Sequence, residues 1–167
     1  MNLYLLRHAI AVEGGTPGLD DSQRELTSEG AAKMTRIARG MLALDLQFDL
    51  ILSSPYIRTR QTADIVAEVF NIREQLRFTE NLIPGVESEQ AILEINTRYR
   101  KNENILLVGH EPTLSSLIAI LVSGDPTLSI IMKKGGLCRL SIPDLVHGRC
   151  ATLEWLLYPS QLAQLGR

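Results

Sequence analysis

The chain has 167 residues and a mass of 18.6 kDa, with 45% hydrophobic and 22% charged residues. These values predict a single domain over residues 1–167 with a packed core, and they argue against a disordered chain. Seventeen basic and nineteen acidic side chains give a net charge of −2, which argues against a dedicated nucleic-acid binder. Residues 114–122 form the longest apolar stretch, which is too short to span a bilayer.

In chain order, apolar runs alternate with amphipathic stretches, which predicts alternating strands and helices. After a first strand at residues 2–6, the Gly- and Asp-rich residues 12–25 predict a loop, and Thr27 is the expected N-cap of the next helix. Ser54 and Pro55 have the N-cap and N1 pattern of a second helix start. The later strands are expected at 49–53, 76–78, 104–108, 137–142 and 152–157, and the helices at 27–44, 54–70, 88–100 and 112–122.

This order predicts an α/β fold, a three-layer sandwich with a mostly parallel central sheet, an antiparallel edge and helices on both faces. The last two strands are expected to pair antiparallel across a polar turn at 144–148. Cys138 and Cys150 lack C-x-x-C spacing, so two inert thiols are favoured over a hairpin disulfide. The N-terminus lacks the basic leader of a signal peptide, and we expect a cytoplasmic monomer with no membrane association.

Four polar side chains follow strands of the expected sheet. Arg7 and His8 follow the first strand, Arg58 lies in the first turn after the second, and His110 follows the strand at 104–108. Ligands bind at the carboxyl ends of such strands, where helix N-termini add positive charge. The planar guanidinium of arginine can donate two parallel hydrogen bonds to phosphate oxygens. Neighbouring positive charges lower the pKa of a histidine, which then stays neutral and nucleophilic. No pair of metal ligands at helical spacing is present, so we expect neither metal nor cofactor.

The same residues lie in four ordered motifs that resemble those of the histidine phosphatase superfamily. These are LLRHA at 5–9, RELTSEG at 24–30, SSPYIRTRQTA at 53–63 and VGHEP at 108–112. The form of the last motif and KKGG at 133–136 look most like the phosphohistidine phosphatase (SixA-type) branch. Ala9 stands where the family usually has glycine, and Thr59 where it has alanine. The resemblance implies a phosphoglycerate mutase-like fold.

The resemblance also implies the role of each residue in the motifs. His8 would be the nucleophile that forms a phosphohistidine intermediate, and Arg7, Arg58 and His110 would bind the phosphoryl group. Arg24 lines up with an arginine that reaches the substrate phosphate in relatives. From the residues alone, Arg24 can equally be a loop side chain that pairs with Asp20 or Asp21.

Many members of the family also have an acidic residue after the third strand that protonates the leaving group. The candidates for this general acid are Glu80, Glu87 and Glu89, none of which lies in a motif. An alkoxide needs such an acid, whereas a protonated imidazole leaves readily without one.

We therefore expect a metal-independent phosphatase that acts on phosphohistidine in a transiently bound signalling or phosphotransfer protein. The alternatives are a small-molecule phosphomonoesterase on the same scaffold and a phosphoprotein-binding module without turnover. The presence of His8 argues against the binding module, because the arginines would suffice for binding alone.

Overall fold

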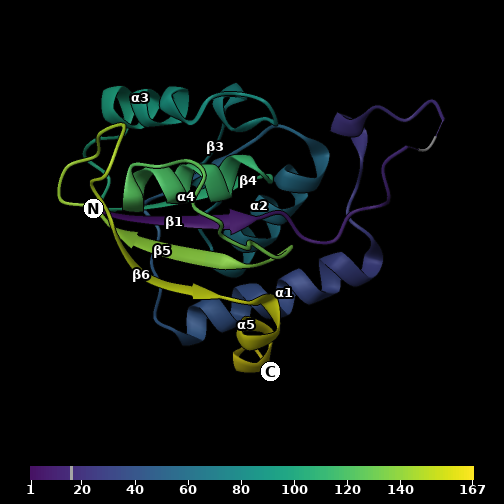
Figure 1. Ribbon diagram of the computed structural model, residues 1–167. Coiled ribbons are helices and arrows are strands. Elements are labelled where there is room, and N and C mark those ends of the chain that lie inside the picture. Colours follow the sequence, from purple (N-terminus) through teal and green to yellow (C-terminus); the bar gives the residue numbers. More distant parts are fainter. Residues whose placement is uncertain (16) are drawn as a thin grey trace.

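The computed structural model describes residues 1–15 and 17–167, and Figure 1 shows a central sheet with helices on both of its faces. The sheet has the strand order β3-β2-β4-β1-β5-β6. β1 pairs parallel with β4, β4 with β2 and β2 with β3, while β5 and β6 form an antiparallel edge. The strands are β1 Asn2–Arg7, β2 Leu50–Ser53, β3 Leu76–Phe78, β4 Asn104–Gly109, β5 Leu137–Ser141 and β6 Thr152–Leu157. The predicted sandwich is confirmed.

The described residues also form five α-helices and three short 3-10 helices. The α-helices are α1 Ser28–Ala43, α2 Ile57–Val69, α3 Ser88–Arg98, α4 Thr113–Ser123 and α5 Pro159–Leu165. The 3-10 helices are η1 Asp21–Gln23, η2 Arg73–Gln75 and η3 Glu80–Leu82. No helix in the described residues is both long and apolar enough to cross a bilayer.

The core has two halves because side chains alternate across a strand. In β1, Leu3 and Leu5 pack with apolar residues of α3 and α4. Tyr4 and Leu6 point to the opposite face and pack with residues of α1, α2 and α5. β1 therefore lies between two apolar layers, which explains its nearly continuous apolar sequence.

Two helix boundaries test the expected caps. Thr27 accepts a hydrogen bond from the amide of Gly30, so the predicted N-cap of α1 is confirmed. The predicted start of α2 at Ser54 and Pro55 is wrong, because the helix begins at Ile57. Ser54 is instead part of the preceding turn, where its Oγ contacts His110.

α5 was not expected from the sequence. Pro159 occupies its first turn, and the Gln161 side chain accepts a hydrogen bond from the amide of Tyr158 at its start. α5 lies against α1 on one face of the sheet (Figure 1). Both cysteines are free thiols, as favoured, and Cys138 is buried.

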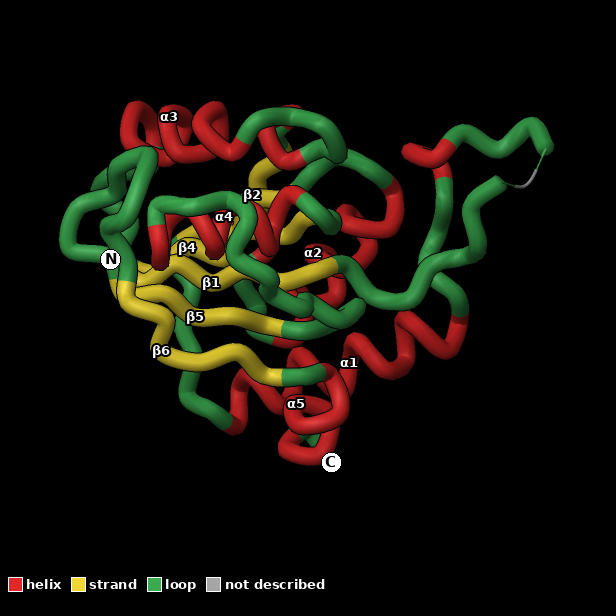
Figure 2. The backbone as a smooth tube through the Cα atoms, in the orientation of Figure 1, coloured by secondary structure: helices red, strands yellow, loops and turns green. Residues whose placement is uncertain are grey.

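The expected loop at 12–25 projects from the edge of the sheet where β1 ends (Figure 2). Its base is closed by a bridge between Ala11 and Leu26 and by a hydrogen bond from the amide of Val12 to the carbonyl of Glu25. Residue 16 within this loop lies outside the described residues. On the return path the loop contains η1, whose first residue is Asp21.

Candidate active site

The four predicted pocket residues meet at one edge of the sheet. The parallel register pairs Arg7 with Gly109 and Ser53 with Val108, so β1, β4 and β2 end at the same level. His8 and His110 follow directly, and their ring centroids lie 5.3 Å apart. Sheet pairing alone therefore brings together residues that are more than a hundred positions apart in the sequence.

His8 is buried, with 6% of its surface exposed. Its Nδ1 lies 2.7 Å from the carbonyl oxygen of Ala9. A carbonyl can only accept a hydrogen bond, so Nδ1 carries the proton and Nε2 keeps its lone pair. Burial lowers the pKa of His8 to about 4, helped by the positive charges of Arg58 and Arg7 and opposed by the Ala9 bond. At neutral pH His8 is therefore an uncharged imidazole with a nucleophilic nitrogen.

His110 is also buried, with 2% of its surface exposed. Its Nε2 lies 2.9 Å from Ser54 Oγ, and that oxygen accepts a hydrogen bond from the amide of Tyr56. This arrangement suits a hydroxyl that donates to Nε2, with the ring proton on Nδ1. Burial, followed by the charge of Arg58, lowers the pKa of His110 to about 3. The ring is thus a neutral hydrogen-bond donor.

The two arginines are held by main-chain oxygens. Arg7 Nη1 donates to the carbonyl of Met132 at 2.7 Å, and Arg58 Nη1 donates to the carbonyl of Asp21. The Nε atoms of Arg7 and Arg58 and the Nδ1 of His110 are buried and have no hydrogen-bond partner among the described residues. Buried polar groups are nearly always paired, so three unpartnered nitrogens at one place indicate a site for an oxyanion.

Arg24 is connected to this pocket through a carboxylate. Its Nη1 lies 2.8 Å from Asp21 Oδ1, while Asp21 Oδ2 lies 2.9 Å from Arg58 Nη2. Of the two alternatives for Arg24, the structure shows the pairing with Asp21, and contact with the substrate stays a prediction. Sequence reasoning missed the contact between Asp21 and Arg58, because the two residues are 37 positions apart and Asp21 lies outside the four motifs.

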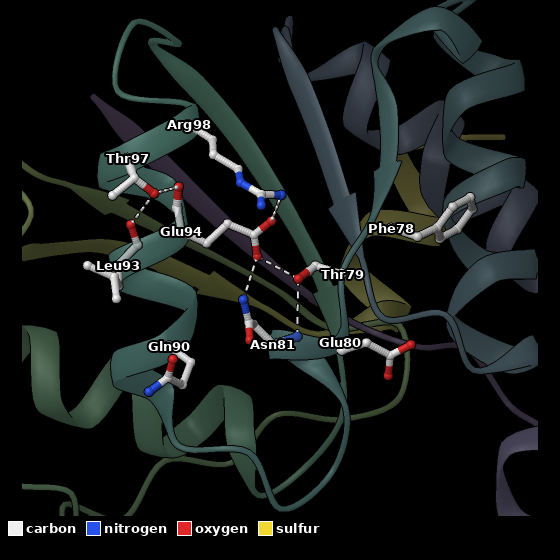
Figure 3. Close-up of a pocket in the computed structure, with 9 residues that line it drawn as sticks. All are labelled: Phe78, Thr79, Glu80, Asn81, Gln90, Leu93, Glu94, Thr97 and Arg98. Atoms are coloured by element: carbon white, nitrogen blue, oxygen red, sulfur yellow. Dashed lines mark hydrogen bonds and ion pairs between the residues drawn. The ribbon is translucent and has the colours of Figure 1, made fainter.

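The three candidate general acids lie between the start of η3 and the first turn of α3. Within the described residues, none of their carboxylates forms a hydrogen bond or ion pair with the two histidines or with Arg7 and Arg58. Figure 3 shows Glu80 beside a cavity in which the buried acid is Glu94, paired with Thr79 and Asn81. Glu87 precedes α3 and Glu89 lies in its first turn. Glu87 also lines a cavity with Pro112 and Thr113, which come shortly after His110 in the sequence, and the assignment of the general acid stays a prediction.

Comparison with known proteins agrees with this geometry. The model of the histidine phosphatase superfamily (branch 1) matches residues 3–83. An uncharacterized protein of Picosynechococcus sp. is 31% identical over 142 residues, which is 84% of each chain. The chain belongs to the histidine phosphatase superfamily. The phosphohistidine phosphatase SixA of Escherichia coli is 25% identical over 167 residues, 97% of this chain and 96% of the relative.

Solved structures of histidine phosphatases show the same fold. The protein histidine phosphatase SixA complexed with tungstate gives a TM-score of 0.83 at 20% identity over 97% of this chain and 99% of that one. A putative SixA from Agrobacterium tumefaciens gives 0.77 at 28% identity over 95% and 97%. These likenesses place the chain in the SixA-type branch with a phosphoglycerate mutase-like fold. Membership of the superfamily supports phosphatase activity.

Proposed function

We propose that the chain is a metal-independent phosphatase that removes the phosphoryl group from phosphohistidine in a protein. The observation that carries the proposal is the environment of His8, a neutral imidazole whose Nε2 lone pair is free. Around it lie three buried nitrogens, on Arg7, Arg58 and His110, that have no partner within residues 1–15 and 17–167. A nucleophile surrounded by unpaired donors is what phosphoryl transfer requires.

The reaction would take place in two steps. His8 Nε2 attacks the phosphorus, and the bond from phosphorus to the substrate nitrogen breaks. Its electron pair goes to the substrate ring, which is already protonated on its other nitrogen and leaves as neutral imidazole. Arg7, Arg58 and His110 donate to the phosphoryl oxygens while charge shifts in the transition state. Water then attacks the phosphorus of the enzyme intermediate, which releases inorganic phosphate and returns the electron pair to His8.

The leaving group distinguishes the substrate classes. An alkoxide leaves slowly without a proton donor, and that donor would have to be one of the candidates Glu80, Glu87 and Glu89. A phosphoramidate with a protonated ring avoids this requirement. The relatives named as phosphohistidine phosphatases support the same preference.

The first experiment measures phosphate release from an aryl phosphate and from a histidine-phosphorylated protein, in the presence of a chelator. We expect the wild type to turn over both substrates, faster on the phosphoprotein, and His8→Ala to lose turnover by at least about a thousandfold, as for other lost nucleophiles. A higher rate on alkyl and aryl phosphates would favour the small-molecule phosphatase. Unchanged turnover by His8→Ala would disprove the covalent mechanism.

A further inference from the structure

Arg58 is held by a residue that the proposed mechanism does not use. The guanidinium donates through Nη1 to the main-chain oxygen of Asp21 and through Nη2 to its carboxylate, 2.9 Å away. These two nitrogens form the end of the arginine fork. Asp21 therefore occupies the whole end-on edge of Arg58 with two acceptors from one residue.

The opposite edge of the same fork is left open. It consists of the Nε hydrogen and the second hydrogen of Nη2, and Nε is buried without a partner. Arg58 itself is 4% exposed, so its Nε is shielded from bulk water. An oxyanion can bind there side-on with two parallel hydrogen bonds while Asp21 stays in place. Carboxylate and oxyanion thus occupy different edges and do not compete for the same hydrogens.

Asp21 is itself anchored. Its other carboxylate oxygen lies 2.8 Å from Arg24 Nη1, and Arg24 Nε donates to the carbonyl of Val12 on the outgoing side of the loop. The hydrogen bond from Arg24, and then the one from Arg58, hold the pKa of Asp21 below its usual value, so the carboxylate is ionised at neutral pH. Arg24 and Asp21 therefore tie both sides of the projecting loop to Arg58.

We infer that Asp21 is a positioning residue that orients Arg58, with the Nε edge of the guanidinium turned toward the phosphoryl group. The inference rests on the proposed function for the identity of that group. Without Asp21, a long arginine side chain has several rotamers to lose on binding, and its open edge is no longer directed. The projecting loop thereby becomes part of the phosphoryl-binding machinery without touching the substrate.

The test compares wild type, Asp21→Ala and Asp21→Asn, with tungstate as the oxyanion probe. We expect Asp21→Ala to weaken inhibition by tungstate on the order of tenfold and to raise KM for an aryl phosphate by a similar factor. Asp21→Asn keeps an oxygen that accepts from Nη2 and should recover part of both losses. Glu25→Gln, an exposed substitution in the same loop, should behave as wild type. Unchanged or tighter tungstate binding by Asp21→Ala would overturn the inference.

A double-mutant cycle separates positioning from general support of the loop. If Asp21 acts through Arg58, the effect of Asp21→Ala on tungstate affinity should vanish in an Arg58→Met background. An undiminished effect in that background would also overturn the inference. Direct binding of tungstate, measured by calorimetry, does not depend on turnover. A wild type that binds tungstate without hydrolysing any phosphate would contradict the proposed function alone and leave the role of Asp21 to the binding data.

Discussion

At the scale of single residues, Ser54 shows how one hydroxyl can define the chemistry of a neighbour. It is fully buried, and its Oγ lies 2.9 Å from His110 Nε2. A histidine is a donor at one ring nitrogen and an acceptor at the other, and the partner of one nitrogen selects the role of the other. Ser54 therefore directs the proton of His110 to Nδ1, the nitrogen that has no partner in the described part of the chain.

Ser54→Ala should lower kcat/KM for an aryl phosphate on the order of tenfold, because His110 would lose its preferred tautomer and a buried hydrogen bond. The matched control is Ser53→Ala. Ser53 is equally buried, but its hydroxyl donates to the main-chain carbonyl of Ser54 and does not contact His110. Steady-state kinetics of the two variants, with circular dichroism to verify folding, tests the assignment. Equal losses for both would contradict a specific role of Ser54.

At the scale of elements, α1 and α5 approach each other so closely that only glycine fits between them. A Cβ atom built at Gly40 of α1 would lie 1.9 Å from the carbonyl oxygen of Leu162 in α5. At Gly166, directly after α5, the same atom would lie 1.9 Å from the carbonyl oxygen of Arg36. Main-chain atoms cannot move aside as a flexible side chain can, so the two helices would have to separate.

Gly40→Ala should therefore lower the free energy of unfolding by about 2 kcal/mol or more, although alanine favours a helix by about 1 kcal/mol relative to glycine. Gly14→Ala is the control, because its Cβ would meet Arg24 no closer than 3.5 Å. We expect the control to change stability by less than about 1 kcal/mol. Urea unfolding of the two variants measures both values. A fully stable Gly40→Ala variant would show that α5 can shift without cost.

At the scale of the whole molecule, the pocket is built at a cost in stability that depends on pH. The pKa of His8 is about 4 and that of His110 about 3 in the folded chain, whereas histidine in an unfolded chain has a pKa near its ordinary value of about 6.5. Between about pH 6.5 and pH 4 the unfolded state therefore binds more protons than the folded state. Stability must rise with pH across this window and fall as the pH is lowered.

His8 and His110 each bind a proton in the unfolded state that they do not bind in the folded state. Replacing His8 by asparagine removes one of these two protons. The slope of the free energy of unfolding between pH 4 and pH 6.5 should then decrease by up to about 1.4 kcal/mol per pH unit. Urea unfolding at several pH values measures the slopes. If His8→Asn and wild type have the same slope, His8 is not held neutral by burial.

Local features of the sequence were sufficient for most elements and for the four pocket residues. Nearly continuous apolar runs predicted β1, β2 and β4, because a strand covered on both faces has few polar residues. The hydroxyl of Thr27 predicted the start of α1, because an N-cap depends on groups only three residues away. Arg7, His8, Arg58 and His110 were found because each follows a strand within a short motif.

The tertiary structure alone decided the remaining features. Ser54 was expected to cap α2, but the fold uses its hydroxyl for His110, 56 residues away. Asp21 was expected at most to pair with its neighbour Arg24, whereas sheet and loop packing bring it to Arg58 as well. Local patterns specify φ/ψ preferences and buried faces, and they contain no information on which distant side chain will be the nearest partner. That partner is decided when strands pair and helices pack. The sequence therefore determined most of the elements, α5 excepted, and the tertiary contacts determined the tautomer of His110 and the orientation of Arg58.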